Sequence, residues 1–187
     1  MRRMGSILQW SERLSMRIRD AILGDIDQMS GFIKELTASG KRKSPDSEAF
    51  VRAHYIEDPG KIRCSVAEEN GVVLGFQSLK RAEAGNKWGV EPGWGIIGTH
   101  IRPSAARRGV GRALFAVTRK AAEDASIAKI DASIANDNME ALAYYEAMGI
   151  RTYRPSEGLV CRCLDLNAQP DCAPTSSLTR FDHRREI

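Results

Sequence analysis

The segment Ile101-Arg102-Pro103-Ser104-Ala105-Ala106-Arg107-Arg108-Gly109-Val110-Gly111 decides how this chain folds. It joins an apolar, strand-like run, Ile96-Ile97-Gly98-Thr99-His100-Ile101, to a helix-like run that begins at Gly111. Pro103 has no N–H to donate to a sheet, so the strand has to stop there. Two glycines then open the helix, where the first unpaired N–H groups and the macrodipole attract anions. The segment therefore predicts a strand, an anion-binding turn and a helix, in that order.

The glycines and the basic residues around them indicate a phosphorylated ligand. Gly109 and Gly111 lack a Cβ, so we expect a ligand to lie against the backbone there. The four arginines that surround them are Arg102, Arg107, Arg108 and Arg112. The dinucleotide-binding pattern Gly-x-Gly-x-x-Gly does not fit, because Leu114 stands at its third position, and no Gly-Lys-Ser/Thr of a P-loop follows. A different phosphate-binding turn is required; the alternative is a tight turn flanked by solvated arginines.

Two motifs resemble those of the GNAT acetyltransferase superfamily. Residues 103–114 are similar to its pyrophosphate-binding motif, Gln/Arg-x-x-Gly-x-Gly/Ala, although Ala106 stands at the leading position. The run Asn138-Met139-Glu140-Ala141-Leu142-Ala143-Tyr144-Tyr145-Glu146-Ala147-Met148-Gly149-Ile150 is similar to the family's Asn-x-x-Ala-x-x-x-Tyr-Glu-x-x-Gly-Phe. The resemblance implies an α/β fold, with a central mixed, mostly antiparallel sheet flanked by helices and a splayed pair of parallel strands.

The resemblance also implies an activity, the transfer of an acetyl group from acetyl-CoA, the cosubstrate, to a primary amine by direct attack. Pantetheine would hydrogen-bond the backbone around Thr99, His100 and Ile101. The remaining implied cofactor contacts are Arg107, Arg108, Gly109, Val110, Gly111, Arg112 and Asn138. Tyr145 matches the family's acid, and a phenol with a pKa near 10 can protonate a departing thiolate. Tyr145 could instead pack on the apolar helix face, and Asn138 could instead cap the helix.

No general base stands out in the sequence. An amine with a pKa of about 10.4 is almost entirely protonated at neutral pH, so the site has to remove a proton. The expected strand 94–101 contains no carboxylate, and His100 is its only titratable residue. The candidates for the base are therefore His100, Glu91 and a chain of water molecules.

Length and composition are those of one globular domain. The chain has 187 residues, 42% of them hydrophobic and 28% charged. We expect an N-terminal extension at 1–15, an acetyltransferase domain at 16–166 and a polar tail at 167–187. The helix after Gly111 has no apolar run long enough to span a bilayer, and Met1-Arg2-Arg3 is not followed by the apolar segment of a signal peptide. We therefore expect a cytoplasmic protein that does not bind a membrane.

The cysteines indicate neither a metal site nor a disulfide framework. Cys64, Cys161, Cys163 and Cys172 lack the paired spacing and the histidine pattern of a zinc site. Cys161 and Cys163 alternate in a strand-like run and should point to the same face. We expect all four to be reduced and expect no metal ion.

The positive charge is local and leaves two alternative functions. The net charge is +4, and residues 102–122 contain six Arg or Lys and no acidic residue. Such a patch can bind nucleic acid, but aromatic residues make up only 6% of the chain, and a phosphorylated cofactor is the more economical explanation. The other alternative is a GNAT-fold module that binds acyl-CoA without catalysis. The acceptor could be a small-molecule or protein amine, and the resemblance leaves a homodimer open.

Periodicity and turn residues place the other elements. We expect strands at 16–19, 62–69, 72–81, 94–101, 129–134 and 159–166, and helices at about 22–40, 47–55, from 109 and from 137 or 138. Asn70-Gly71 is typical of a type I′ hairpin. Glu140, three residues after Asp137, suggests a capping box. Trp88 and Trp94 border a loop, where they could wall a binding cleft or be buried anchors.

Overall fold

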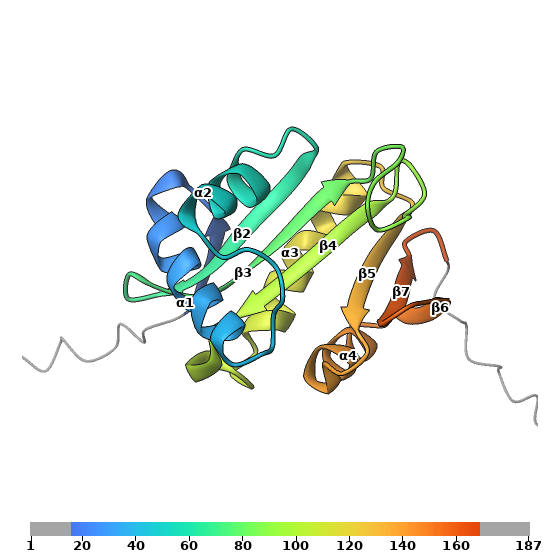
Figure 1. Cartoon of the computed structure of the whole chain (residues 1–187). Helices are drawn as coiled ribbons and strands as arrows, with labels where there is room; N and C mark the ends of the chain where they lie inside the picture. Colours follow the sequence, from blue (N-terminus) through green and yellow to red (C-terminus); the bar gives the residue numbers. More distant parts are fainter. Residues whose placement is uncertain (1–15, 169–187) are drawn as a thin grey trace, which may run out of the picture.

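The computed structural model describes residues 16–168, which form a seven-stranded sheet in the order β1-β2-β3-β4-β5-β7-β6, flanked by helices (Figure 1). The strands are β1 (Arg17–Asp20), β2 (Lys61–Glu69), β3 (Val72–Arg81), β4 (Gly95–Ile101), β5 (Lys129–Ala135), β6 (Arg151–Ser156) and β7 (Leu159–Asp165). The helices are α1 (Ile26–Ala38), α2 (Glu48–Val51), α3 (Val110–Asp124) and α4 (Met139–Ala147). The predicted extension at 1–15 and the tail from 169 onward lie outside the described residues.

Local sequence signals account for the centre of the sheet. β2 and β3 form the predicted hairpin, and Asn70 and Gly71 both have positive φ, 54° and 77°, as a type I′ turn requires. β3 continues into β4 through a loop, and those two strands are also antiparallel. Of the six neighbouring strand pairs in the described sheet, only β4 and β5 are parallel, because α3 returns the chain to the same end. The expected mixed, mostly antiparallel sheet is confirmed.

β4 and β5 form a fork. They pair only at Gly95 with Ile130 and at Ile96 with Asp131, although both strands continue for several residues. Figure 1 shows them separating toward the end of β4, where α4 follows β5. The splayed parallel pair that the resemblance implied is therefore present, and we call the Ile96–Asp131 pair the apex of the fork.

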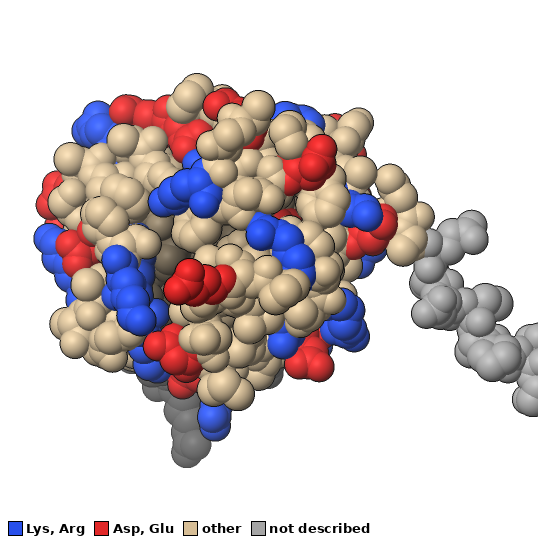
Figure 2. All heavy atoms as spheres, turned by 45° about the vertical axis from the view of Figure 1, so that its right-hand side comes forward, with Lys and Arg blue, Asp and Glu red and all other residues tan. Residues whose placement is uncertain are grey.

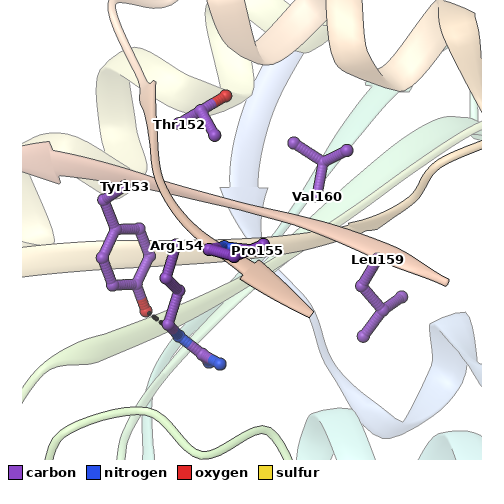
Figure 3. Close-up of a pocket in the computed structure, with 6 residues that line it drawn as sticks. All are labelled: Thr152, Tyr153, Arg154, Pro155, Leu159 and Val160. Carbon is purple, nitrogen blue, oxygen red and sulfur yellow. Dashed lines mark hydrogen bonds between the residues drawn. The ribbon is translucent and has the colours of Figure 1, made fainter. Parts of the chain in front are cut away.

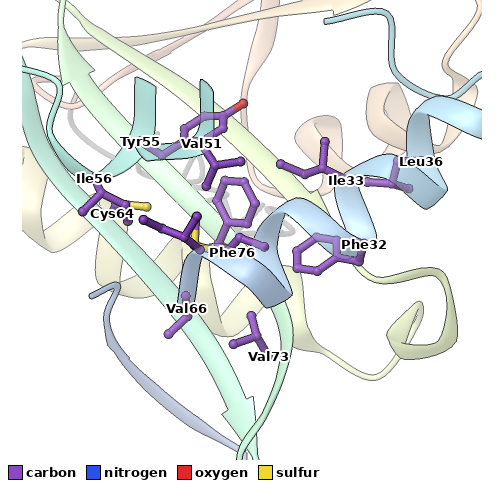
Figure 4. Packing of buried hydrophobic residues seen from close by; sticks show 12 residues of the cluster. Phe32, Ile33, Leu36, Val51, Tyr55, Ile56, Cys64, Val66, Val73 and Phe76 are labelled. Atoms are coloured by element: carbon purple, nitrogen blue, oxygen red, sulfur yellow. The ribbon is translucent and has the colours of Figure 1, made fainter. Parts of the chain in front are cut away.

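The helices cover the two faces of the sheet and create two main cores. We call the face covered by α1 and α2 the front face, and Figure 4 shows its core around Phe32 and Phe76. α3 and α4 cover the back face, where Leu114 and Phe115 are buried against the strands. Alternation sends Ile97 to the back and His100 to the front of the same strand. Within 16–168, no helix has the length and apolar character needed to cross a membrane.

Three expectations about elements need correction. Ile22 is 59% exposed, because a 3-10 turn precedes α1 and the helix begins only at Ile26. The helical spacing of Val110, Leu114, Val117 and Ala121 predicts that they form the buried face of α3, but the buried residues include Phe115, Thr118 and Ala122, so that face is rotated. Strand β6 was not predicted: Pro155 argues against a central strand, but β6 is an edge strand that pairs only with β7.

The described cysteines are free thiols. Cys161 and Cys163 lie opposite Ser133 and Asp131 of β5, so they share a face as predicted. Burial raises the pKa of the Cys64 thiol to about 12 and that of Cys163 to about 11, so neither is a reactive thiolate at neutral pH. Cys172 lies outside the described residues.

Candidate functional site

The turn between β4 and α3 presents open backbone. Gly109 is the N-cap of α3 with φ of 81°, a left-handed conformation that favours glycine, and a Cβ there would have no heavy atom within 4 Å. Arg107, two residues earlier, also has a positive φ, 61°. Gly109 itself is exposed, so α3 begins at an open glycine turn, which is the backbone that the predicted anion site requires.

Gly111 is needed for a different reason from the one expected. A Cβ on Gly111 would lie 2.7 Å from Cε2 of Tyr144, which is closer than carbon atoms can pack. The Tyr144 hydroxyl donates to the Gly111 carbonyl at 2.9 Å. The missing Cβ of Gly111 thus leaves room for the Tyr144 side chain of α4, and not for a ligand.

The four arginines of this segment do not converge on the turn. The Arg102 guanidinium stacks on Phe32 and lies 3.8 Å from Glu35, so it belongs to the α1 side. Arg108 pairs with Glu69 at 2.7 Å, which already compensates its charge. Arg107 and Arg112 are exposed and have no carboxylate within 4 Å among the described residues. These two are the free cations at the turn.

A buried network of neutral groups joins this turn to the back side of the fork. Gln77 Nε2 donates to Thr99 Oγ1 at 2.7 Å and to the Tyr144 hydroxyl at 3.1 Å. Thr99 Oγ1 in turn lies 2.9 Å from the Tyr145 hydroxyl. Because Tyr144 bonds to Gly111, the chain of hydrogen bonds runs to Tyr145 from residues 107–112, the predicted phosphate-binding turn, which we call the phosphate turn. Gln77 Oε1 is buried without a partner among the described residues.

Tyr145 is both a core residue and a hydrogen-bonded phenol. Its ring is 6% exposed and packs with Ala141 and Met148, as the apolar face of the helix predicted. Burial raises the pKa of the Tyr145 hydroxyl above its usual value, so the phenol stays protonated at neutral pH. The packing role and the role of a proton donor are therefore compatible.

Asn138 caps α4. Its side-chain oxygen accepts from Ala141 N at 3.0 Å, and this bond establishes the capping role that the sequence left open. The capping box predicted from Asp137 and Glu140 is not formed, because Asn138 is the N-cap and Glu140 pairs with Lys41 at 2.8 Å.

His100 is poorly suited to be the base. It lies on the front face, and its Nε2 is 3.1 Å from the Tyr55 hydroxyl. Burial, reinforced by the positive charge of Arg42, lowers the pKa of His100 to about 3. Because its pKa is so low, the His100 imidazole is a weak base and would bind a proton from an amine only weakly. Glu91, the other candidate side chain, is exposed in the loop 82–94.

The structure adds a residue that the sequence reasoning missed, Asp131 of β5. It is buried at the apex of the fork and accepts hydrogen bonds from Tyr153 and Ser133, each at 2.9 Å. Burial raises the pKa of Asp131, although those two hydroxyls act in the opposite direction. The signal was a carboxylate in the middle of an apolar strand. Sequence alone does not show that this carboxylate lies beside β4, because the contact depends on the pairing of β5 with β4.

A cavity of about 540 Å³ lies on the front face beside the apex. Its lining includes Ile96 of β4, His54 and Trp88, so Trp88 walls a cleft as the sequence suggested. Trp94 is instead an anchor that packs on Tyr153, with ring centroids 5.8 Å apart.

A smaller cavity, of about 350 Å³, lies at the β6–β7 hairpin (Figure 3). There Arg154 donates to the Tyr153 hydroxyl at 2.8 Å, and Tyr153 donates to Asp131. This hairpin therefore supports the buried carboxylate rather than forming a separate polar centre.

Charge on the side of the molecule shown in Figure 2 is mixed. Basic and acidic side chains alternate there around a hollow, and neither sign forms a continuous patch. This side therefore lacks the continuous basic surface that nucleic-acid binding would require. Among residues 16–168, no group of three or more His, Cys, Asp or Glu side chains could hold a metal ion.

Solved structures with the same fold are numerous. A putative acetyltransferase, yncA of Salmonella typhimurium, solved with acetyl-CoA, is 21% identical with a TM-score of 0.65, covering 84% of this chain and 98% of its own. A GCN5-related N-acetyltransferase from Kribbella flavida is 21% identical with a TM-score of 0.68, covering 81% and 98%. A ribosomal-protein-alanine N-acetyltransferase from Brucella melitensis is 16% identical with a TM-score of 0.65, covering 80% and 99%.

No curated protein sequence matches this chain. The model of the acetyltransferase (GNAT) family matches residues 30–150, which include most of α1, all of α2, the fork, the turn before α3, and α4. The match and the geometry agree, and the chain belongs to the GNAT acetyltransferase family.

Proposed function

We propose that this protein is an N-acetyltransferase that transfers the acetyl group of acetyl-CoA directly to a primary amine. The observation that supports this most strongly is the fork between β4 and β5, because it opens next to the exposed N-terminus of α3. A long, narrow cofactor with a pyrophosphate at one end and a thioester at the other matches that arrangement. The fold neighbour from Salmonella typhimurium was solved with acetyl-CoA.

The phosphate turn would hold the pyrophosphate. The backbone N–H groups from Gly109 to Arg112 offer donors at a helix N-terminus, and Arg107 and Arg112 add free positive charge. Arg108 would have to leave Glu69 to take part. Pantetheine would follow β4 past the backbone of residues 99–101, on the side that β5 no longer occupies.

Tyr145 would protonate the leaving group. The amine nitrogen attacks the thioester carbonyl carbon, the C–N bond forms, and the C–S bond of the tetrahedral intermediate then breaks. The departing thiolate takes the proton of the Tyr145 hydroxyl, and the tyrosinate is stabilised by Thr99, 2.9 Å away, until it is reprotonated. A neutral phenol suits this step because it does not lose its proton to solvent beforehand.

Asp131 would receive the proton of the amine. It lies beside Ile96 at the apex of the fork, buried behind the cavity that Ile96 lines, so the proton would reach it through the apex. The raised pKa of Asp131 makes it a stronger base than an exposed aspartate. The amine attacks in its neutral form, after the free ammonium has lost one proton to solvent. Once the C–N bond has formed, the nitrogen of the intermediate is positively charged and more acidic than the free ammonium, and it gives its second proton to Asp131.

The experiment that tests the function is thiol release from acetyl-CoA over a panel of amines, with acetyl-CoA binding measured by calorimetry on the wild type and on Tyr145→Phe. We expect at least one amine to stimulate release, and we expect the variant to bind acetyl-CoA but release thiol slowly. Binding without stimulation by any amine would favour a non-catalytic acyl-CoA-binding module. Absence of binding would refute the assignment of the phosphate turn.

A further inference from the structure

We propose that the acceptor is an amine that also bears an acidic group, as a free amino acid does, and that it binds in the front-face cavity beside the fork. This inference rests on the proposed N-acetyltransferase function. It selects among the small amines, amino acids, polyamines and protein lysines that family membership alone leaves open.

A row of three side chains crosses the sheet at the apex. Lys80 of β3 pairs with Ile96 of β4, and Ile96 pairs with Asp131 of β5, so all three side chains point to the front face. Neighbouring strands are about 4.8 Å apart, which puts Lys80 and Asp131 on the order of 10 Å apart along the row. Lys80 and Ile96 line the cavity, whereas Asp131 is fully buried and does not, so Lys80 is the charged member of this row that can meet the acidic group of an acceptor.

Lys80, the cation of this row, has N–H donors that its ion pair with Asp58 does not use. Lys80 Nζ lies 3.0 Å from Asp58 Oδ2, and an ammonium group has three N–H donors. The other oxygen of Asp58 accepts from Gly60 N at 2.9 Å, so both oxygens of that carboxylate are engaged. Lys80 can therefore bind a second anion without giving up Asp58.

A second cation on the cavity wall has no acidic partner. Lys87 Nζ lies 4.6 Å from the centre of the Trp88 ring and has no carboxylate within 4 Å among the described residues. Arg81 points away, toward the carbonyls of Gly93 and Ala125, and Glu83 is the second acidic side chain of the lining. Lys87 and Lys80 are thus the cations available to a carboxylate in this cavity.

The wall behind the cavity adds further positive charge. Arg42 is only 9% exposed, and its guanidinium bonds to the carbonyls of Ser44 and Pro45 and to the Tyr55 hydroxyl, all uncharged. It also stacks on Phe50, which stacks on His54 at the cavity. Burial and the charges of Lys80 and Lys87 lower the pKa of His54, so this ring stays neutral. A polycationic acceptor would be repelled here, whereas an acidic group compensates the field.

Matched acceptors test this inference. Thiol release from acetyl-CoA is measured with common L-amino acids, with their primary amides and with the corresponding decarboxylated amines, together with spermidine and a short peptide with a free N-terminus. We expect kcat/KM to be about tenfold or more higher for an amino acid than for its amide. Lys80→Gln and Lys87→Gln should each raise KM for the acid about tenfold and leave KM for the amide unchanged. Lys34→Gln, an exposed lysine of α1, is the control and should change neither.

The outcomes separate this inference from the function on which it rests. If amides, amines, spermidine or the peptide react as well as the amino acids, the acidic-acceptor inference is wrong and the acetyltransferase function stands. The same holds if both lysine variants lower the rates for acid and amide alike. If no acceptor stimulates thiol release from folded protein that binds acetyl-CoA, the proposed function itself fails.

Discussion

The two faces of the sheet differ in chemistry where the fork opens. On the back face the polar groups are neutral, and they are Gln77, Thr99, Tyr144 and Tyr145. On the front face they include an amine and a carboxylate, Lys80 and Asp131, beside the neutral imidazole of His100. Strands β3, β4 and β5 supply both sets, since consecutive residues of a strand point to opposite faces. The sheet thus has two different sites on its two faces. On the back face a phenol can donate a proton, and on the front face charged groups can bind.

The difference follows from what each face can stabilise. Burial raises the pKa of Tyr144 and of Tyr145, which keeps the back face uncharged at neutral pH. On the front face Lys80 has Asp58, and Asp131 has two hydroxyl donors, so each charge is partly compensated. A variant that removes a phenol should therefore change the chemistry of the back face alone, and a variant that removes a charge should change that of the front face alone.

The largest effect is expected from removing the phenol of the back face. Tyr145→Phe should lower kcat about 10²- to 10⁴-fold, because the leaving thiolate loses its proton donor. The affinity for acetyl-CoA should stay within about twofold, since the ring still packs in the core. Tyr144→Phe is the matched control, because it removes the hydroxyl next door. A similar loss of kcat in both variants would contradict a specific role for Tyr145.

Removal of the buried carboxylate tests the front face. Asp131→Asn should lower kcat/KM about 100-fold and abolish the acidic limb of the pH–rate profile, where the wild type loses activity as Asp131 becomes protonated. Tyr153→Phe removes one hydrogen bond to Asp131 and should move that limb to higher pH while keeping it. A limb that persists in Asp131→Asn would show that another group titrates.

Asp131→Asn should lower activity but raise the stability of the fold. Burial raises the folded-state pKa of Asp131 above that of the unfolded chain, so ionisation of this carboxylate destabilises the fold. The preference of the fold for protonated Asp131 contributes fully to stability at a pH below the unfolded-state pKa of this carboxyl. The contribution is lost as the pH rises through its folded-state pKa. Asp131→Asn should therefore have a higher free energy of unfolding than the wild type at pH 8, and urea titrations at pH 4 and pH 8 should show the difference shrinking in acid. A variant less stable at pH 8 would contradict this.

A smaller effect, on stability, is expected from substitution of Gly111, where the phosphate turn contacts Tyr144 of the back face. Gly111→Ala should lower the free energy of unfolding by about 1–3 kcal/mol, because the new Cβ would lie 2.7 Å from Tyr144. Tyr144→Leu in the same chain should recover part of that loss, as measured by urea titration. Gly109→Ala is strained by its positive φ instead, so Tyr144→Leu should not rescue it. Equal rescue of both glycine variants would argue against the contact.

The smallest effect is expected at the turn itself. Arg112→Gln should weaken acetyl-CoA binding about fivefold, whereas Arg108→Gln should weaken it no more than about twofold, because Glu69 already pairs with Arg108. Calorimetry at two salt concentrations would show a smaller salt dependence for Arg112→Gln. If Arg108→Gln has the larger effect, Arg108 leaves Glu69 when the cofactor binds.

Features that depend on neighbouring residues could be predicted from the sequence. Pro103, Gly109 and the hairpin residues Asn70-Gly71 act through steric limits on the backbone, which a few residues determine. The two motifs predicted the phosphate turn and the role of Tyr145, and both stay predictions. The fork also followed from the resemblance, since the helix between β4 and β5 requires a parallel crossover.

Tertiary structure alone decided which side chains meet. Arg102 and Arg108 have carboxylate neighbours on α1 and β2, and Tyr144 fills the space beside Gly111, contacts that no spacing within the turn could reveal. Asp131 lies at the apex of the fork only because β5 pairs with β4 there, and the base role that we propose for it depends on that pairing. The sequence by itself therefore determined the backbone of the cofactor turn and the candidate acid. The candidate base and the acceptor cavity depend on long-range strand pairing, which local sterics do not specify.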